Sequence, residues 1–191
     1  MIVRQGFVSN SSSSSFIVAF PKKEEKLNHD ELYQLMCPDH DNRYNMDENY
    51  HLVDSWYQKE DDLKKSDEDV IERVYRDMGK VATEEELLEE LSNSFGWAAY
   101  EMFQKEYPKN FDTLSIKERK VFRTKIQKKQ KEWQHSKAQP EYKKLVEEAT
   151  KQYGENKFVF YSFSYADEDG EGWLEHSDIF NQLPSRCFSH H

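Results

Sequence analysis

The two ends of the chain show strand-like patterns. Residues 157–165 (KFVFYSFSY) alternate with period two, so that successive side chains face opposite sides, which predicts a strand. The block at 16–20 (FIVAF) is β-branched and aromatic and is followed by Pro21, which predicts another strand. The turn-rich acidic stretch 166–172 separates residues 157–165 from 173–176, which we expect to return as the second strand of a hairpin.

The middle of the chain has helical spacing. Sequences of the capping-box form, S/T-x-x-D/E, predict helix starts at Ser66, Thr83 and Ser115, and a shorter helix is predicted over 30–37. The helix that begins at Thr83 is expected to bury one continuous stripe and to end before Pro108. That stripe consists of Leu87, Leu88, Leu91, Phe95, Ala98, Ala99, Met102 and Phe103.

The basic helix that begins at Ser115 has a narrow apolar face. Phe122, Ile126 and Trp133 form this face. Pro140 suits the first turn of a further helix over 141–153, because proline lacks the N–H that an interior position would need. Gly154 is expected to end that helix.

These elements make the protein α+β. We expect a small antiparallel sheet, built from the N-terminal strand and the C-terminal hairpin, with a bundle of about four to five helices on one of its faces. The 191 residues suit a single domain over 1–191. Its sheet-forming ends are 1–20 and 157–191, and its helical middle is 22–154.

The composition is that of a folded, polar protein. Hydrophobic residues make up 36% and charged residues 34%, but aromatic residues reach 14%, which excludes a disordered chain. The sequence contains no apolar run of about 18 residues and no secretory signal at its start, which predicts neither a membrane span nor export. Two cysteines cannot form a disulfide framework, so the expected location is the cytoplasm.

The charge is divided unevenly along the chain. The net charge is −10, yet residues 115–139 hold nine Lys or Arg against two Glu, so this basic stretch carries +7 and the rest −17. Two interpretations are open: the stretch binds nucleic acid, or it pairs with the acidic residues at 84–90. The sequence pI of about 5.2 argues against a nucleic-acid partner, for which the basic stretch is the sole support.

Three short segments hold the candidate chemistry. The first is the acidic turn, in which Asp167, Asp169 and Glu171 have the alternating oxygen ligands that Ca²⁺ or Mg²⁺ prefers. The alternative is a solvated hairpin tip, where Asp and Gly are the residues that a turn requires. No other cofactor is predicted.

The second segment contains histidines. Glu175, His176 and His190, with Cys187 nearby, have the groups for proton transfer or for a transition metal if the C-terminal residues fold back. The spacing matches no zinc signature. A solvated tail is the alternative interpretation for His190 and its neighbour His191.

The third segment is the serine run. Backbone N–H groups and hydroxyls of small residues can cradle a phosphate. The candidate ligand-binding residues are Asn10, Ser11, Ser12, Ser13 and Ser14. A phosphoacceptor site and an inert, ordered loop between two core-anchored segments remain alternatives.

Both ends of the chain also resemble a known group of proteins. The opening RQGFVSNSSSSSFIVAFPK and the closing YSFSYADEDGEGWLEHSDIFNQLPSRCFSHH are similar to uncharacterised proteins of tailed phages and some bacteria. In that group a GFVSNSSSSSF-type N-terminus, an acidic Asp-Gly turn, a Leu-Glu-His triplet and a terminal histidine recur. The resemblance implies no activity, but it implies a native His190-His191 pair, a serine run within the fold, and chain ends that meet in one sheet.

The leading functional hypothesis is a phage-type accessory protein that binds a host or phage protein in the cytoplasm of the host cell. Charge segregation would orient such an encounter, and the expected aromatic anchors are Trp56, Tyr57, Trp133 and Trp173. The rival is a small metal-dependent hydrolase or a domain that binds a nucleotide or another phosphate ligand. Its site would lie between the serine run 9–15, the turn 167–171, His176 and His190, and whether the protein is an enzyme stays open.

Overall fold

The protein combines a three-stranded sheet with helices, which confirms the predicted α+β class. The computed structural model describes residues 13–36, 60–166, 180 and 182–190. The strands are β1 (Ser13–Pro21), β2 (Phe158–Ala166) and β3 (Ser185–His190). The helices are α1 (His29–Met36), α3 (Glu60–Asp77), α4 (Glu84–Ser94), α5 (Gly96–Gln104), the short 3-10 helix η2 (Phe111–Thr113) and α6 (Ile116–Tyr153). Within these ranges no helix is both long enough and apolar enough to cross a membrane.

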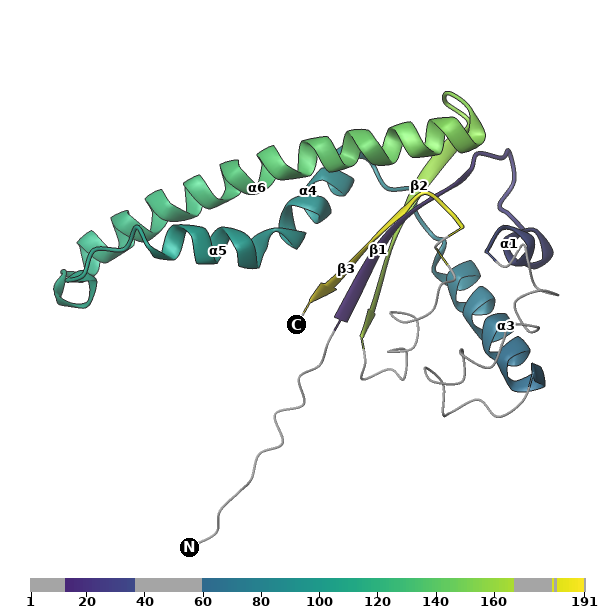
Figure 1. The fold of residues 1–191 in the computed structure, drawn as a ribbon, viewed down its shortest axis with the longest axis horizontal. Coiled ribbons are helices and arrows are strands. Elements are labelled where there is room, and N and C mark those ends of the chain that lie inside the picture. The colour runs from purple at the N-terminus through teal and green to yellow at the C-terminus, as the bar shows by residue number, and fades with distance from the viewer. Residues whose placement is uncertain (1–12, 37–59, 167–179, 181, 191) are drawn as a thin grey trace, which may run out of the picture.

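The sheet has the strand order β2-β1-β3, and both pairings are antiparallel. The N-terminal strand therefore lies in the centre, between two strands from the C-terminal end of the chain (Figure 1). β2 confirms the strand predicted at 157–165. Residues 173–176, predicted as the returning strand, lie outside the described residues, and the strand that joins the sheet later in the chain is 185–190.

Helices cover both faces of this sheet, so the expectation of helices on one face is wrong. Phe16, Val18 and Phe20 of β1 pack with residues of α1 and α3 on one face. Ile17 and Ala19, which point the opposite way, pack with residues of α4 and α6 on the other. A strand that is covered on both faces needs apolar side chains at every position, which is the physical reason for the unbroken run at 16–20.

Helix α6 continues through Pro140, whereas the sequence predicted that a new helix begins there. Proline removes one backbone hydrogen bond and its ring crowds the carbonyl of residue i−4, here Ser136. Ala138 and Leu145, on either side of the proline, are both buried in the cluster that packs on the sheet. This shared packing keeps the two halves of the helix in line.

The single helix expected from Thr83 to Phe103 is instead two helices, α4 and α5, that meet at Phe95. The Thr83 capping box is confirmed: its hydroxyl accepts from the Glu86 N–H, and Lys80 and Thr83 together lower the pKa of the Glu86 carboxyl to about 2. Near the end of α4, the Ser92 and Ser94 hydroxyls donate to backbone carbonyls at 2.6 and 2.7 Å. Such bonds compete with the helical ladder and favour its end.

The other two capping boxes have opposite outcomes. Ser115 accepts from the Glu118 N–H and caps α6, as predicted. Ser66 lies inside α3, which begins at Glu60, so the predicted helix start there is wrong. The S-x-x-D sequence also occurs within helices. It marks a helix start only where its serine has the non-helical backbone conformation of an N-cap residue.

Two side-chain contacts fasten α6 to the sheet. The Tyr153 hydroxyl donates to the Ala19 carbonyl at 3.2 Å, and burial raises the pKa of Tyr153 to about 12. Arg186 of β3 donates to both carboxylate oxygens of Glu148 at 2.8 and 3.0 Å. The C-terminal half of α6 is thus held to the sheet at two strands. Tyr153 binds the central strand β1, and Glu148 binds the edge strand β3.

Candidate interaction surface on the helical arm

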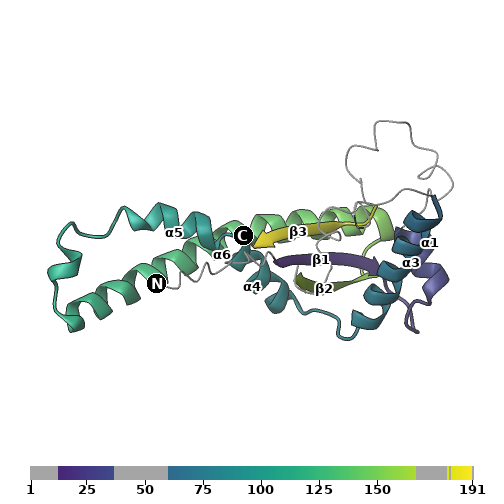
Figure 2. The same cartoon turned by 90° about the horizontal axis from the view of Figure 1, so that it is seen from below.

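A helical hairpin projects beyond the sheet. We call residues 95–137, which contain α5, η2 and the first part of α6, the arm. Figures 1 and 2 show α5 and α6 side by side, extending away from the sheet on the side opposite to α1 and α3. The arm therefore has its own small interior and its own exposed faces.

Aromatic rings hold the far end of the arm together. Tyr107, Phe111 and Phe122 form a triangle with ring centroids 4.9, 5.2 and 5.8 Å apart. The guanidinium of Arg123 lies 5.6 Å from the centre of the Phe111 ring. Edge-to-face contacts of this kind add to the stability gained from burial alone.

Nearer the sheet, α5 packs on the apolar stripe of α6. The Phe95 and Trp133 rings meet edge to face at 6.3 Å, and Ala99 and Ile126 are fully buried. Lys129 donates to the Glu106 carboxylate, which links the two helices. The narrow face that the sequence predicted for this helix is thus the one that α5 covers.

The outer face of α5 carries exposed apolar side chains. Trp97 is 70% exposed, and its ring lies 5.6 Å from that of Tyr100, which is 46% exposed. Met102 on the same helix is 53% exposed. Ala98 and Met102 were expected in the buried stripe, but the break at Phe95 ends that stripe and leaves both exposed.

The predicted aromatic anchors have different outcomes. Trp56, Tyr57 and Trp173 lie outside the described residues. Trp133 is half-buried against Phe95, so it serves the interior of the arm and not its surface. Trp97 was missed, although its position off the Leu87–Phe103 stripe was a signal that it faces solvent.

Within the described residues, the ion pairs that the structure shows for the basic stretch are with Glu106 and Glu132. On α4, Glu86 pairs with Lys80, and Glu90 accepts a hydrogen bond from Ser162. The acidic helix packs on the part of α6 that follows the basic stretch, where Ala138, Leu145 and Ala149 are buried.

Part of the serine run belongs to the sheet. Ser15 is buried and its hydroxyl lies 3.1 Å from that of Ser164. In the register of β1, Ser13 lies opposite Ala166 on one side and opposite His190 on the other. The backbone of His190 is therefore part of a strand, and the interpretation of this residue as a solvated tail is replaced.

Most of the other candidate residues lie outside the described residues. They are Asn10, Ser11, Ser12, Asp167, Asp169, Glu171, Glu175 and His176. Ser14 lies opposite Tyr165 and Ser189 in the sheet. The described part of the chain contains no group of three His, Cys, Asp or Glu residues that could hold a metal ion.

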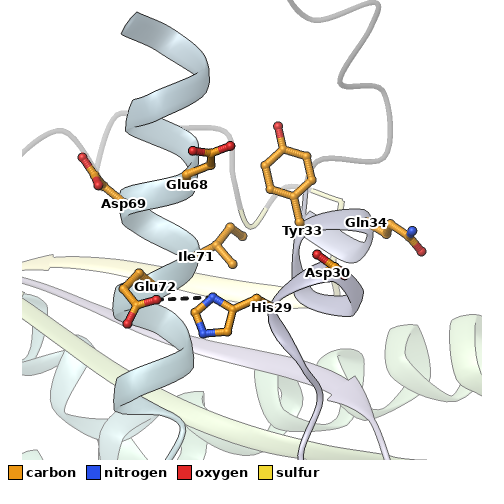
Figure 3. Close-up of a pocket in the computed structure, with 8 residues that line it drawn as sticks. All are labelled: His29, Asp30, Tyr33, Gln34, Glu68, Asp69, Ile71 and Glu72. Carbon is orange, nitrogen blue, oxygen red and sulfur yellow. Dashed lines mark ion pairs between the residues drawn. The ribbon is translucent and has the colours of Figure 1, made fainter. Parts of the chain in front are cut away.

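A pocket of about 700 Å³ lies between α1 and α3. Figure 3 shows His29 and Glu72 facing each other across it, with the His29 Nδ1 3.3 Å from a Glu72 carboxylate oxygen. The His29 ring also packs on Tyr75 at 4.1 Å. The remaining lining residues are Asp30, Tyr33, Gln34, Glu68, Asp69 and Ile71. This acidic pocket therefore combines the His29–Glu72 ion pair with the exposed carboxylates of Asp30, Glu68 and Asp69.

Comparison of the chain with protein-family models, with curated proteins and with solved structures finds no match.

Proposed function

We propose that this protein is a phage-type accessory protein that acts by binding a host or phage protein through the outer face of α5. The observation that carries the proposal is the exposed pair of Trp97 and Tyr100 on a projecting arm. Tryptophan and tyrosine are the residues that most often dominate the free energy of protein association. An apolar groove on the partner would accept both rings.

The surroundings of this pair support a binding surface. The arm has its own packed interior, which includes Ala99, Ile126 and the Phe95–Trp133 contact, so Trp97 and Tyr100 are not needed to hold α5 against α6. Rigid rings on a packed helix lose little conformational entropy when they become buried in an interface. Exposed aromatic side chains that lie together on one face, as Trp97 and Tyr100 do, are typical of interaction sites.

The Trp97→Ala variant is expected to weaken the binding of a partner isolated from the source cells. Loss of an aromatic anchor costs about 2 kcal/mol or more, which raises the Kd about 30-fold. Isothermal titration with the purified partner measures this change. Thermal unfolding should move little, because substitutions of exposed residues usually alter stability by less than about 0.5 kcal/mol.

Val81→Ala is the matched control for this experiment. Val81 is also an exposed apolar residue, at 45%, but it lies between α3 and α4 and outside the arm. Its Kd should stay at the wild-type value. An unchanged Kd in both Trp97→Ala and Tyr100→Ala would exclude this surface as the binding site. Sedimentation that shows self-association through α5 would identify a second copy of the chain, and not a different protein, as the partner.

The register of β1 supports a second proposal, a divalent cation or phosphate site at one end of the sheet. Ser13 lies between the backbones of Ala166 and His190, and Asp167 follows Ala166 directly in the chain. Ser13 of the serine run therefore meets the ends of β2 and β3 at this end of the sheet, and the acidic turn follows β2 in the sequence. Oxygen ligands of this kind favour Ca²⁺ or Mg²⁺.

Calcium or magnesium is then expected to raise the melting temperature. A cation present at a hundred times its Kd adds about 2.7 kcal/mol to the free energy of unfolding, or roughly 5 to 10 °C for a domain of this size. Scanning fluorimetry measures the shift in melting temperature. The Asp167→Asn variant should abolish this shift. The control Asp112→Asn, which changes an exposed residue of the arm, should retain it. A wild-type protein that shows no shift with either cation would rule out the cation site.

A further inference from the structure

The arm has a second exposed face, formed by lysines of α6. Three of the nine basic residues of the stretch contact the arm itself: Arg123 lies over Phe111, Lys137 over Trp133, and Lys129 pairs with Glu106. Four others are exposed and point away from α5, and we call them the lysine face. They are Lys117, Lys120, Lys128 and Lys131.

Helix geometry places these four lysines on one side of α6. At about 100° per residue, they fall within an arc of roughly 80°. Phe122, Ile126 and Trp133, which belong to the interior of the arm, lie on the opposite side of the helix. With a rise of about 1.5 Å per residue, the lysine face is a straight row about 21 Å long.

We infer that the lysine face binds the phosphate backbone of nucleic acid without reading its sequence. Duplex DNA rises about 3.4 Å along its axis for each phosphate of a strand, so the row spans about six base pairs and its four lysines can reach phosphates that border a groove. Lysine ammonium groups bind phosphates as point charges. Such contacts do not reach the base edges, so they do not depend on the nucleotide sequence. This inference goes beyond the proposed function and rests on a different face of the arm.

The composition of the lysine face favours a polyanion over a protein. The core of a protein interface is rich in aromatic and apolar residues and depleted in lysine. Along the lysine face, Thr124 lies within the arc of the lysines, Val121 and Gln127 lie at its two edges, and the face includes no aromatic ring. The ion pair of Lys128 with Glu132 is long, 3.8 Å, and exposed, so it opposes phosphate binding only weakly.

The shape of the molecule weakens the objection from its net charge. Ala138 marks where α6 begins to pack on the sheet, and Lys117 lies 21 residues before it, or about 32 Å along the helix. The Debye length is about 10 Å in 0.1 M salt. The described acidic residues that surround the sheet are therefore largely screened from the far end of the lysine face, so they do not cancel the local field there.

Fluorescence anisotropy of a labelled DNA duplex tests the inference on the full chain. Four phosphate contacts give a slope of log K against log salt near −3.6, which is a loss of affinity of about 100-fold between 50 and 200 mM salt. Lys120→Glu with Lys131→Glu should reduce that loss to about tenfold and weaken binding at low salt. Lys22→Glu with Lys143→Glu, two exposed lysines of the body, is the matched control and should behave as wild type.

Three results would overturn the inference. The first is the absence of binding to the duplex at 50 mM salt, and the second is an equal effect of the two double variants. The third is polyglutamate that binds to the lysine face at least as tightly as DNA does, which would assign the face to an acidic protein. Trp97→Ala should leave DNA binding unchanged, so failure of the protein-binding proposal and failure of this one are distinguishable.

Discussion

The Phe20→Ala variant is expected to lose about 3 to 5 kcal/mol of unfolding free energy, the usual cost of removing a buried phenylalanine ring. Phe20 is fully buried near the end of the central strand. Its ring meets those of Tyr161 and Phe163 edge to face at 5.8 and 6.4 Å, and it belongs to the cluster that joins the sheet to α1 and α3. The cavity would therefore open between two layers that are held by different parts of the chain.

Equilibrium unfolding in urea measures the loss through the midpoint and slope of the transition. Val121→Ala is the control, because Val121 is 64% exposed and should change stability by less than about 0.5 kcal/mol. A loss of less than 1 kcal/mol or so in Phe20→Ala would contradict the tight packing of this cluster.

The Pro140→Ala variant is expected to gain about 2 kcal/mol. Alanine restores the hydrogen bond from residue 140 to the Ser136 carbonyl and removes the clash of the proline ring, worth about 3 kcal/mol in a helix interior. This gain is reduced by about 0.4 to 1 kcal/mol, because alanine leaves the unfolded chain more conformational freedom than proline does. The melting temperature should rise by roughly 4 to 8 °C.

Calorimetry of the two proteins under the same conditions measures this gain. Gln139→Ala, the adjacent substitution in the same helix, should shift the melting temperature much less because it restores no backbone hydrogen bond. A melting temperature that falls in Pro140→Ala would show that the proline fits a bend on which the packing of α6 depends.

Local sequence signals predicted the elements well where they act over one helical turn or one strand. The capping boxes at Thr83 and Ser115 are satisfied within four residues of the chain, so the sequence alone is sufficient to find them. The alternation at 157–165 is likewise confirmed: Phe160 lies in one core cluster and Phe163 in the other.

The features that depend on contacts distant in sequence were not predictable in the same way. Continuation of α6 through Pro140 is stabilised by packing on the sheet, and no local pattern records that packing. The unbroken apolar run at 16–20 is typical of a strand covered on both faces, but the sequence analysis expected helices on one face only. Trp97 became a candidate only after the break at Phe95 fixed which side of α5 is buried.

For the candidate site, the sequence identified the basic stretch but not which of its side chains face solvent. Nine positive charges along 115–139 are evident from composition. Their division into residues that contact the arm and residues that face solvent depends on where α5 packs, which is set by the Phe95–Trp133 and Glu106–Lys129 contacts.

The central position of β1 has a consequence for synthesis of the chain. Both neighbours of this strand come from the other end of the sequence: Ser15 and Ser164, whose hydroxyls meet, are 149 residues apart. At about 5 to 20 residues per second, the ribosome needs roughly 7 to 30 s to supply β2 after β1 has been made. During that interval the five apolar residues at 16–20 have no strand partner, and the sheet is completed only after residues 185–190 have been translated.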